Sequence, residues 1–288
     1  MFLRSHNVAV SGSNFMKPIL SFSELAVPRP VLNKMHDLKY TEPTPIQSLC
    51  WPTLLSGTNM VGVAQTGSGK TLGFVLPMVV HILNNQRYAR SFERDDLPGP
   101  VGLVLAPTRE LAVQIQEVAT QIGSVVGLRN VAVYGGASKG PQLADVRRGA
   151  DIYIATPGRL IDNVRERNVS LHRCTFLVLD EADRMLDMGF EPQIRKIIEQ
   201  IRPDRQTAMF SATWPKEVRK LAEDFISNAV LINIGAQEHE HARLQGDHFR
   251  RDQETRRHHH QVHTGPRLLL PVHTRKQEAE RARVGSQG

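Results

Sequence analysis

The stretch Ala64-Gln65-Thr66-Gly67-Ser68-Gly69-Lys70-Thr71 decides the fold of this 288-residue chain. It follows an apolar run and opens a helical pattern, with the glycine spacing of a phosphate-binding loop and alanine in place of the usual first glycine. Glycines let backbone N–H groups point at phosphate oxygens, and a helix start adds a favourable dipole. We predict that residues 66–69 cradle phosphates, that Lys70 lies beside the β- and γ-phosphates, and that the Thr71 hydroxyl binds Mg²⁺. The alternative is a glycine-rich turn that merely precedes a lysine.

A second chemical signal is the stretch Leu177-Val178-Leu179-Asp180-Glu181-Ala182-Asp183. Its acids follow an apolar run typical of a strand, and open α/β sheets bind ligands at the carboxyl ends of their strands. Asp180 is suited to hold hydrated Mg²⁺, and Glu181 to orient and deprotonate an attacking water. Alone, the pattern would favour a capped, acidic helix start. The phosphate-loop pattern upstream favours the catalytic interpretation.

Apolar runs alternate with helical patterns along the body of the chain. The runs are rich in Val, Leu and Ile, which suits buried parallel strands. They are Met60–Ala64, Gly102–Ala106, Val131–Tyr134, Ile152–Ala155, Phe176–Leu179, Ala208–Phe210 and Val230–Ile234. The helical patterns include Glu110–Ile122, Pro192–Ile201 and Lys216–Ile226. This alternation predicts an α/β domain with a parallel sheet covered by helices on both faces.

The composition indicates the kind of partner and compartment. The net charge of +7 favours anionic partners, of which nucleic acid is the commonest. Cys50 and Cys174 have no metal-type neighbours, which indicates buried thiols in a reducing compartment. No run of about 18 apolar residues occurs, so we expect no membrane span. We expect the protein in the nucleus, the cytoplasm or both.

The two ends of the chain differ from its body. Residues 1–20 contain Ser11, Gly12 and Ser13 and predict a loose N-terminal arm. Residues 236–288 are rich in Arg, Gln and Glu, and they include the cluster His258–His260. Such a segment buries too little apolar surface to offset its chain entropy, so we predict a disordered, basic, His-rich tail. The folded domain is then expected over residues 21–235.

The motifs together resemble the DEAD-box ATP-dependent RNA helicases, whose signature is Asp180-Glu181-Ala182-Asp183. The other motifs of that family's first RecA-like motor domain follow in order. They are Phe22 and Thr41-Glu42-Pro43-Thr44-Pro45-Ile46-Gln47 (the Q motif), Pro107-Thr108-Arg109-Glu110-Leu111-Ala112, Gly135-Gly136, Thr156-Pro157-Gly158-Arg159 and Ser211-Ala212-Thr213. The resemblance covers residues 20–235. Trp51-Pro52 and the stretch Arg184–Phe190 resemble a nuclear subgroup of the family tied to transcription and splicing. Lys39-Tyr40 departs from the Gly-Phe of many members.

The resemblance implies roles on the nucleotide side of the domain. Gln47 would select adenine, because an amide both donates to and accepts from the adenine edge. Phe22 would stack on the base, although an ordinary core phenylalanine is the alternative. Lys70, Asp180 and Glu181 would carry the hydrolysis of ATP with Mg²⁺. Asp183, Ser211 and Thr213 would couple these acids to the RNA-binding side.

The resemblance also implies an RNA-binding surface that grips the sugar–phosphate backbone without reading sequence. Strand-to-helix junctions suit phosphate contact through side chains and helix N-termini. The residues concerned are Pro107, Thr108, Arg109, Gly136, Thr156, Pro157, Gly158 and Arg159. For Arg109 the alternative is a solvated helix residue paired with Glu110. The partner would be single-stranded or duplex RNA.

A complete helicase of this family has a second RecA-like domain with motifs of the form Arg-Gly-x-Asp and His-Arg-x-Gly-Arg. Nothing after Ile234 resembles either motif. We therefore expect a monomeric first motor domain, slow in ATP turnover and unable to unwind RNA alone, with protein partners in ribonucleoprotein complexes. The alternative is a nucleotide-dependent RNA- or protein-binding fragment that competes with a full-length helicase. RNA-stimulated ATP hydrolysis separates the two.

Overall fold

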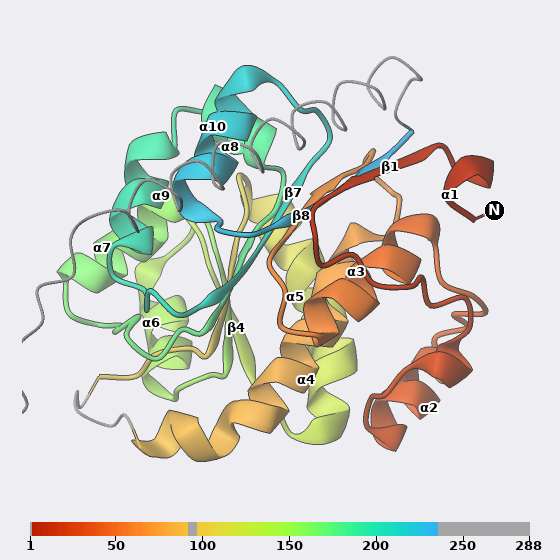
Figure 1. Ribbon diagram of the computed structural model, residues 1–288. Coiled ribbons are helices and arrows are strands. Elements are labelled where there is room, and N and C mark those ends of the chain that lie inside the picture. The colour runs from red at the N-terminus through yellow and green to blue at the C-terminus, as the bar shows by residue number, and fades with distance from the viewer. Residues whose placement is uncertain (1, 92–96, 236–288) are drawn as a thin grey trace, which may run out of the picture. The chain divides into compact units, whose positions relative to one another are not determined.

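The computed structural model describes residues 2–91 and 97–235. The predicted disordered tail, 236–288, lies outside the described residues. The described part is an eight-stranded sheet between two groups of helices (Figure 1). No helix among these residues is long and apolar enough to cross a membrane.

The sheet has the strand order β1-β8-β2-β7-β6-β3-β5-β4. Its strands are β1 (Val8–Ser11), β2 (Met60–Val63), β3 (Gly102–Leu105), β4 (Asn130–Val133), β5 (Ile152–Ala155), β6 (Phe176–Leu179), β7 (Gln206–Ser211) and β8 (Val230–Ile234). Strands β2 to β8 run parallel to one another, and β1 pairs antiparallel with β8. All seven strands expected from the apolar runs are confirmed.

Helices cover both faces of the sheet, as predicted. One face carries α2 (Arg29–Asp37), α3 (Pro45–Leu55), α4 (Lys70–Ser91) and α5 (Arg109–Gly123). The other carries α6 (Lys139–Arg147), α7 (Pro157–Arg165), α8 (Ala182–Asp187), α9 (Glu191–Ile198) and α10 (Lys216–Phe225). The shorter helices are α1 (Phe2–Ser5), η1 (Phe22–Glu24) and η2 (Ser124–Val126).

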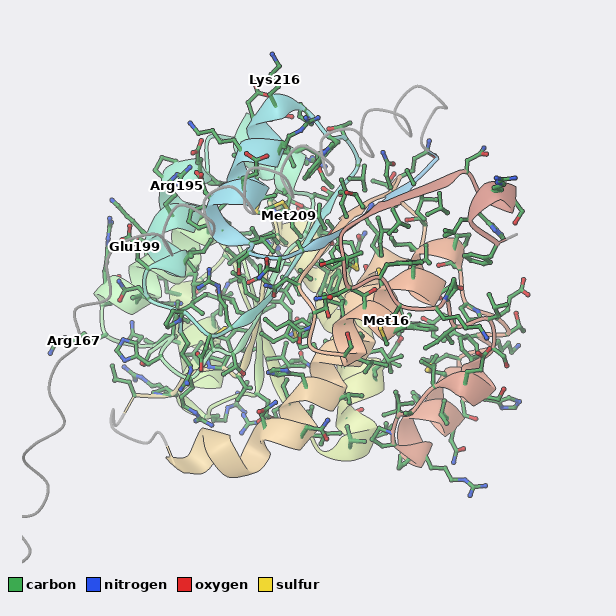
Figure 2. The ribbon with its side chains drawn as sticks, viewed as in Figure 1. Met16, Arg167, Arg195, Glu199, Met209 and Lys216 are labelled. Carbon is green, nitrogen blue, oxygen red and sulfur yellow. The ribbon has the colours of Figure 1, made fainter. Side chains whose placement is uncertain are left out.

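Alternate residues of each strand point to opposite faces, so the sheet divides two apolar cores. In β6, Phe176 and Val178 join the core under α3 to α5, while Leu177 and Leu179 join the core under α7 to α10. Met209 of β7 lies in the second core (Figure 2). Burial on both faces explains why the strands are continuous apolar runs. The two predicted buried thiols, Cys50 and Cys174, are confirmed.

The prediction of a loose arm over residues 1–20 is wrong for residues 8–11. These residues form β1, which pairs antiparallel with β8, with Val8 opposite Ile234. Val8 and Ala9 are each only 2% exposed, so the pairing buries apolar side chains that a loose arm would leave in water. The apolar run is short and is followed by Ser11 and Gly12, residues typical of a loop, so the sequence did not indicate a strand. The folded unit therefore begins before residue 21.

Candidate nucleotide-binding site

The phosphate-binding-loop motif lies between the carboxyl end of β2 and the start of α4, at Lys70. Gly67 and Gly69 have φ angles of 78° and 92°, a region that side chains disfavour. Lys70 is 7% exposed, and its Nζ donates to the carbonyl oxygens of Ala64 at 2.6 Å and Gln65 at 2.9 Å. The loop thus folds around its own lysine.

Other residues of the motif border the same loop. Thr66 is exposed, and Thr71 is half-buried in the first turn of α4. The Ser68 hydroxyl is buried and has no hydrogen-bond partner among the described residues. A buried hydroxyl without a partner costs free energy, about 1–3 kcal/mol. An oxygen-rich ligand in the loop would remove that cost.

The acidic motif begins at the carboxyl end of β6. Asp180 is 2% exposed, and burial raises its pKa to about 7 against the opposing attraction of Lys70. Burial also lowers the pKa of Lys70, while Asp180, Glu181 and Asp183 act in the other direction. An ammonium and three carboxyl groups therefore share one electrostatic environment, which suits a ligand that combines anionic phosphates with a cation.

Glu181 stands at the N-cap of α8 with φ 51° and ψ 53°, a left-handed conformation that is unfavourable for a glutamate. Its backbone N–H donates to Asp180 Oδ1 at 3.0 Å, and its carboxylate lies 3.7 Å from the Arg184 guanidinium. Strained backbone of this kind persists only where surrounding contacts hold it, and it clusters at functional sites.

Ser211, at the end of β7, joins the two motifs because β7 lies between β2 and β6 in the sheet. Its carbonyl oxygen accepts from Ala64 N at 3.0 Å, and its hydroxyl accepts from Asp183 N at 3.3 Å. Asp183 Oδ2 accepts from Thr213 N at 3.0 Å and from Thr213 Oγ1 at 2.8 Å. Although burial raises the Asp183 pKa, the hydrogen bonds from Thr213 and Ser211 outweigh it and lower the pKa.

Gln47 lies against the phosphate loop with its amide engaged by the protein. Its Nε2 donates to the Gly69 carbonyl oxygen at 3.1 Å, and its Oε1 accepts from Thr44 N at 3.0 Å. Each end of the amide retains hydrogen-bonding capacity, since Nε2 carries two protons and Oε1 two lone pairs. Gln47 therefore touches the loop directly, a contact that the sequence pattern did not predict.

Phe22 is half-buried and packs against Trp51, with ring centroids 5.8 Å apart. Trp51 is fully buried, and its Nε1 donates to the Leu72 carbonyl oxygen in the first turn of α4 at 3.3 Å. Sequence reasoning missed this contact. The available signal was the spacing of Gln47 and Trp51, four residues apart and therefore on one face of α3.

Residues expected to contact RNA lie after the next strands, β3, β5 and β4, on the same edge of the sheet. Pro107 is buried, and Thr108 caps α5 because its Oγ1 accepts from Leu111 N at 3.2 Å. The Arg109 guanidinium lies 5.1 Å from the centre of the Tyr134 ring. The alternative for Arg109 was a solvated helix residue paired with Glu110; the structure shows an exposed Arg109 in this cation–π contact.

A hydrogen-bonded cluster joins the remaining residues of this edge. Gly135 N donates to Thr156 Oγ1 at 3.2 Å, which fixes the turn containing Gly136 beside the start of α7. Arg159 Nη2 donates to the Ala137 carbonyl oxygen at 3.0 Å. Pro157 is buried and Gly158 half-buried in the first turn of α7. Arg159 is thus partly engaged by the protein, whereas Arg109 is exposed.

A parallel sheet with a phosphate loop after β2, an acidic pair after β6 and a connecting strand between them defines a RecA-like P-loop NTPase domain. Within that class, the chain belongs to the DEAD/DEAH box helicase family, whose model matches residues 44–221.

Individual relatives agree with this assignment. The chain is 60% identical over 221 residues to ATP-dependent RNA helicase p62 of Drosophila melanogaster, covering 77% of this chain and 30% of that protein. It is 57% identical over 233 residues to probable ATP-dependent RNA helicase DDX17 of Mus musculus, covering 81% and 35%. The chain thus spans about a third of the length of these curated relatives.

Solved structures show the same fold. The yeast DEAD-box splicing factor Prp28 superposes with a TM-score of 0.73 at 31% identity, covering 81% of this chain and 56% of that one. The RNA helicase Prp28 from Chaetomium thermophilum, solved bound to ADP, gives a TM-score of 0.73 at 37% identity, covering 82% and 56%.

Proposed function

We propose that this chain is the first motor domain of an ATP-dependent RNA helicase, which binds ATP with Mg²⁺ at one half of the sheet edge and the RNA backbone at the other. The observation that carries the proposal is the position of Ser211. Its backbone bonds to the phosphate loop and its side chain to the acidic motif, so a change in one motif is transmitted to the other through a single residue.

On the nucleotide side, residues 66–69 would surround the phosphates. Lys70 would exchange its carbonyl partners for phosphate oxygens, which are stronger acceptors because they are charged. Gln47 would use its remaining donor and acceptor on the adenine edge, and Phe22 would stack on the base. Since Gln47 also bonds to Gly69, adenine binding at one end of the amide would be felt by the phosphate loop.

The donors available for Mg²⁺ are Asp180 and Thr71. Few protein ligands suit this cation, which usually keeps several waters and binds one or two carboxylates together with substrate phosphates. The raised pKa of Asp180 supports the assignment, because a nearby cation would stabilise its buried carboxylate. When bound, Mg²⁺ would neutralise the charge of the transferred phosphoryl group. Glu181 would accept the proton of the attacking water.

On the RNA side, Arg109 is an exposed cation, and the α5 and α7 N-termini face the same edge. Asp183 would relay the nucleotide state to this side through Ser211 and Thr213. We expect slow ATP turnover by the isolated chain, because helicases of this family complete the phosphate site with arginines from a second RecA-like domain. An arginine supplied across the cleft accelerates related reactions by about 10³–10⁵.

RNA-stimulated ATP hydrolysis by the purified chain tests the proposal. We expect slow hydrolysis that rises with added single-stranded RNA and is lost in Glu181→Gln, which should still bind ATP. Glu199→Gln, at the exposed C-cap that follows α9, is the matched control and should behave like the parent (Figure 2). Hydrolysis that does not respond to RNA, or that survives Glu181→Gln, would contradict the proposal. ATP binding without measurable hydrolysis would favour the binding-fragment alternative.

A further inference from the structure

A cavity of about 490 Å³ opens at the edge of the sheet opposite the nucleotide site. Its lining includes Asn59, Val101 and Thr175, which directly precede β2, β3 and β6, and Gln206, the first residue of β7. The candidate nucleotide site lies at the carboxyl ends of these strands. Four-residue strands at about 3.3 Å per residue separate the two edges by about 13 Å, so the cavity is a separate site.

The cavity has a basic lining. Arg173, Arg202 and Arg205 contribute three positive charges, and Asp204 contributes one negative charge. His81 also lines it and adds no charge at neutral pH, because burial lowers its pKa to about 4 while its Nε2 lies 2.8 Å from Thr175 Oγ1. The titratable groups that line the cavity among the described residues therefore sum to two positive charges, which favours a dianion.

The three arginines differ in the hydrogen-bond acceptors that they already contact within the protein. Arg202 forms a two-point ion pair with Asp204 at 2.8 and 2.7 Å. Arg205 donates to the carbonyl oxygens of Arg202 and of Phe225, the last residue of α10, so it also stabilises that helix end. Arg173 donates to no acceptor within residues 2–91 and 97–235, and the Nε atoms of Arg173 and Arg205 are buried without a partner there.

Buried polar groups without partners are rare in folded proteins, and an unseen ion is one of their ordinary explanations. Guanidinium groups match phosphate oxygens in a planar, two-point geometry. The volume falls within the range of small-molecule sites, about 300–1,000 Å³. We propose that this cavity binds a small soluble diphosphate-type anion, with Arg173 as its main anchor and Arg202 and Arg205 supplying further charge.

Titration calorimetry with inorganic pyrophosphate tests the proposal. Lys70→Ala serves as the background, so that the phosphate loop contributes little. We expect saturable binding at one site, weakened at least tenfold by Arg173→Gln, since a charged hydrogen-bonded pair contributes about that much. The pyrophosphate affinity of Arg173→Lys should fall between those of the Arg173 background and Arg173→Gln, because lysine keeps the charge but loses the planar guanidinium.

Arg167→Gln is the charge-matched control, because Arg167 is an exposed arginine on the surface outside the cavity (Figure 2). It should change the affinity less than twofold. Non-saturating uptake, or equal weakening by Arg167→Gln and Arg173→Gln, would overturn the proposal in favour of general charge attraction. Equal melting temperatures of the variants exclude unfolding as the cause. In the Lys70 parent, Arg173→Gln should leave ATP-analogue affinity unchanged, so the two proposals fail independently.

Discussion

Gly69 of the phosphate loop lies against Gln47 and Thr44 of the Q motif, and Gly69→Ala probes that contact. A Cβ on Gly69 would lie 2.6 Å from Gln47 Nε2 and 2.9 Å from Thr44 Oγ1. The Gln47 amide must then move and lose its hydrogen bond to Gly69, whereas Thr44 is β-branched and stiff. The φ of 92° adds backbone strain of about 1–2 kcal/mol for any residue with a Cβ.

Gly67→Ala is the matched control, since Gly67 also has a positive φ but nothing lies within 4 Å of its added Cβ. We expect Gly67→Ala to lower the free energy of unfolding only by the backbone strain, and Gly69→Ala to lower it by about 1–3 kcal/mol more because of overpacking. Each kcal/mol corresponds to about 2–4 °C in melting temperature for a domain of this size. Differential scanning calorimetry measures the melting temperatures of both variants. Adding Gln47→Ala to Gly69→Ala should recover part of the loss, and equal melting temperatures for the two glycine variants would refute the reasoning.

Three further predictions concern charged groups. Lys70→Ala should abolish or severely weaken binding of a fluorescent ATP analogue while far-UV circular dichroism stays unchanged, and equal affinity would remove the phosphate-loop assignment. Because burial raises the Asp180 pKa from 3.8 to about 7, the folded state binds the proton more tightly, and stability should fall as pH rises from about 4 to about 7. At pH 8 the free energy of unfolding of Asp180→Asn, measured by urea denaturation, should therefore exceed that of the parent by up to about 4 kcal/mol, and near pH 4 the two should be equal. A difference that does not change with pH would contradict this. Arg109→Gln should reduce the logarithmic salt slope of single-stranded RNA binding, measured by fluorescence anisotropy, by about 0.7, and an unchanged slope would exclude a phosphate contact.

The strands were predictable from sequence because each is buried on both faces and so forms a continuous apolar run. Met60–Val63 and Phe176–Leu179 illustrate this. β1 was not predictable in the same way, since its four residues, which end at Ser11 before Gly12, are stabilised by pairing with β8, which is distant in sequence. Short edge strands depend on tertiary contacts more than on propensity.

The candidate site was predictable as a set of motifs but not as a network. The motifs gave Gln47, Lys70 and Asp180 individually, because each has a residue type suited to one part of a nucleotide. The bridge through Ser211 depends on β7 lying between β2 and β6, which is a property of strand order. The Trp51 bond to Leu72 likewise depends on the packing of α3 against α4.

Titration calorimetry of the chain with non-hydrolysable ATP and GTP analogues in the presence of Mg²⁺ tests the central claim most directly. If residues around Gln47 and Lys70 form an adenine-selective nucleotide site, the ATP analogue should bind at one site and the GTP analogue at least tenfold more weakly. Chelation of Mg²⁺ should weaken the ATP analogue further. Absence of binding, or equal affinity for the two analogues, would contradict the claim.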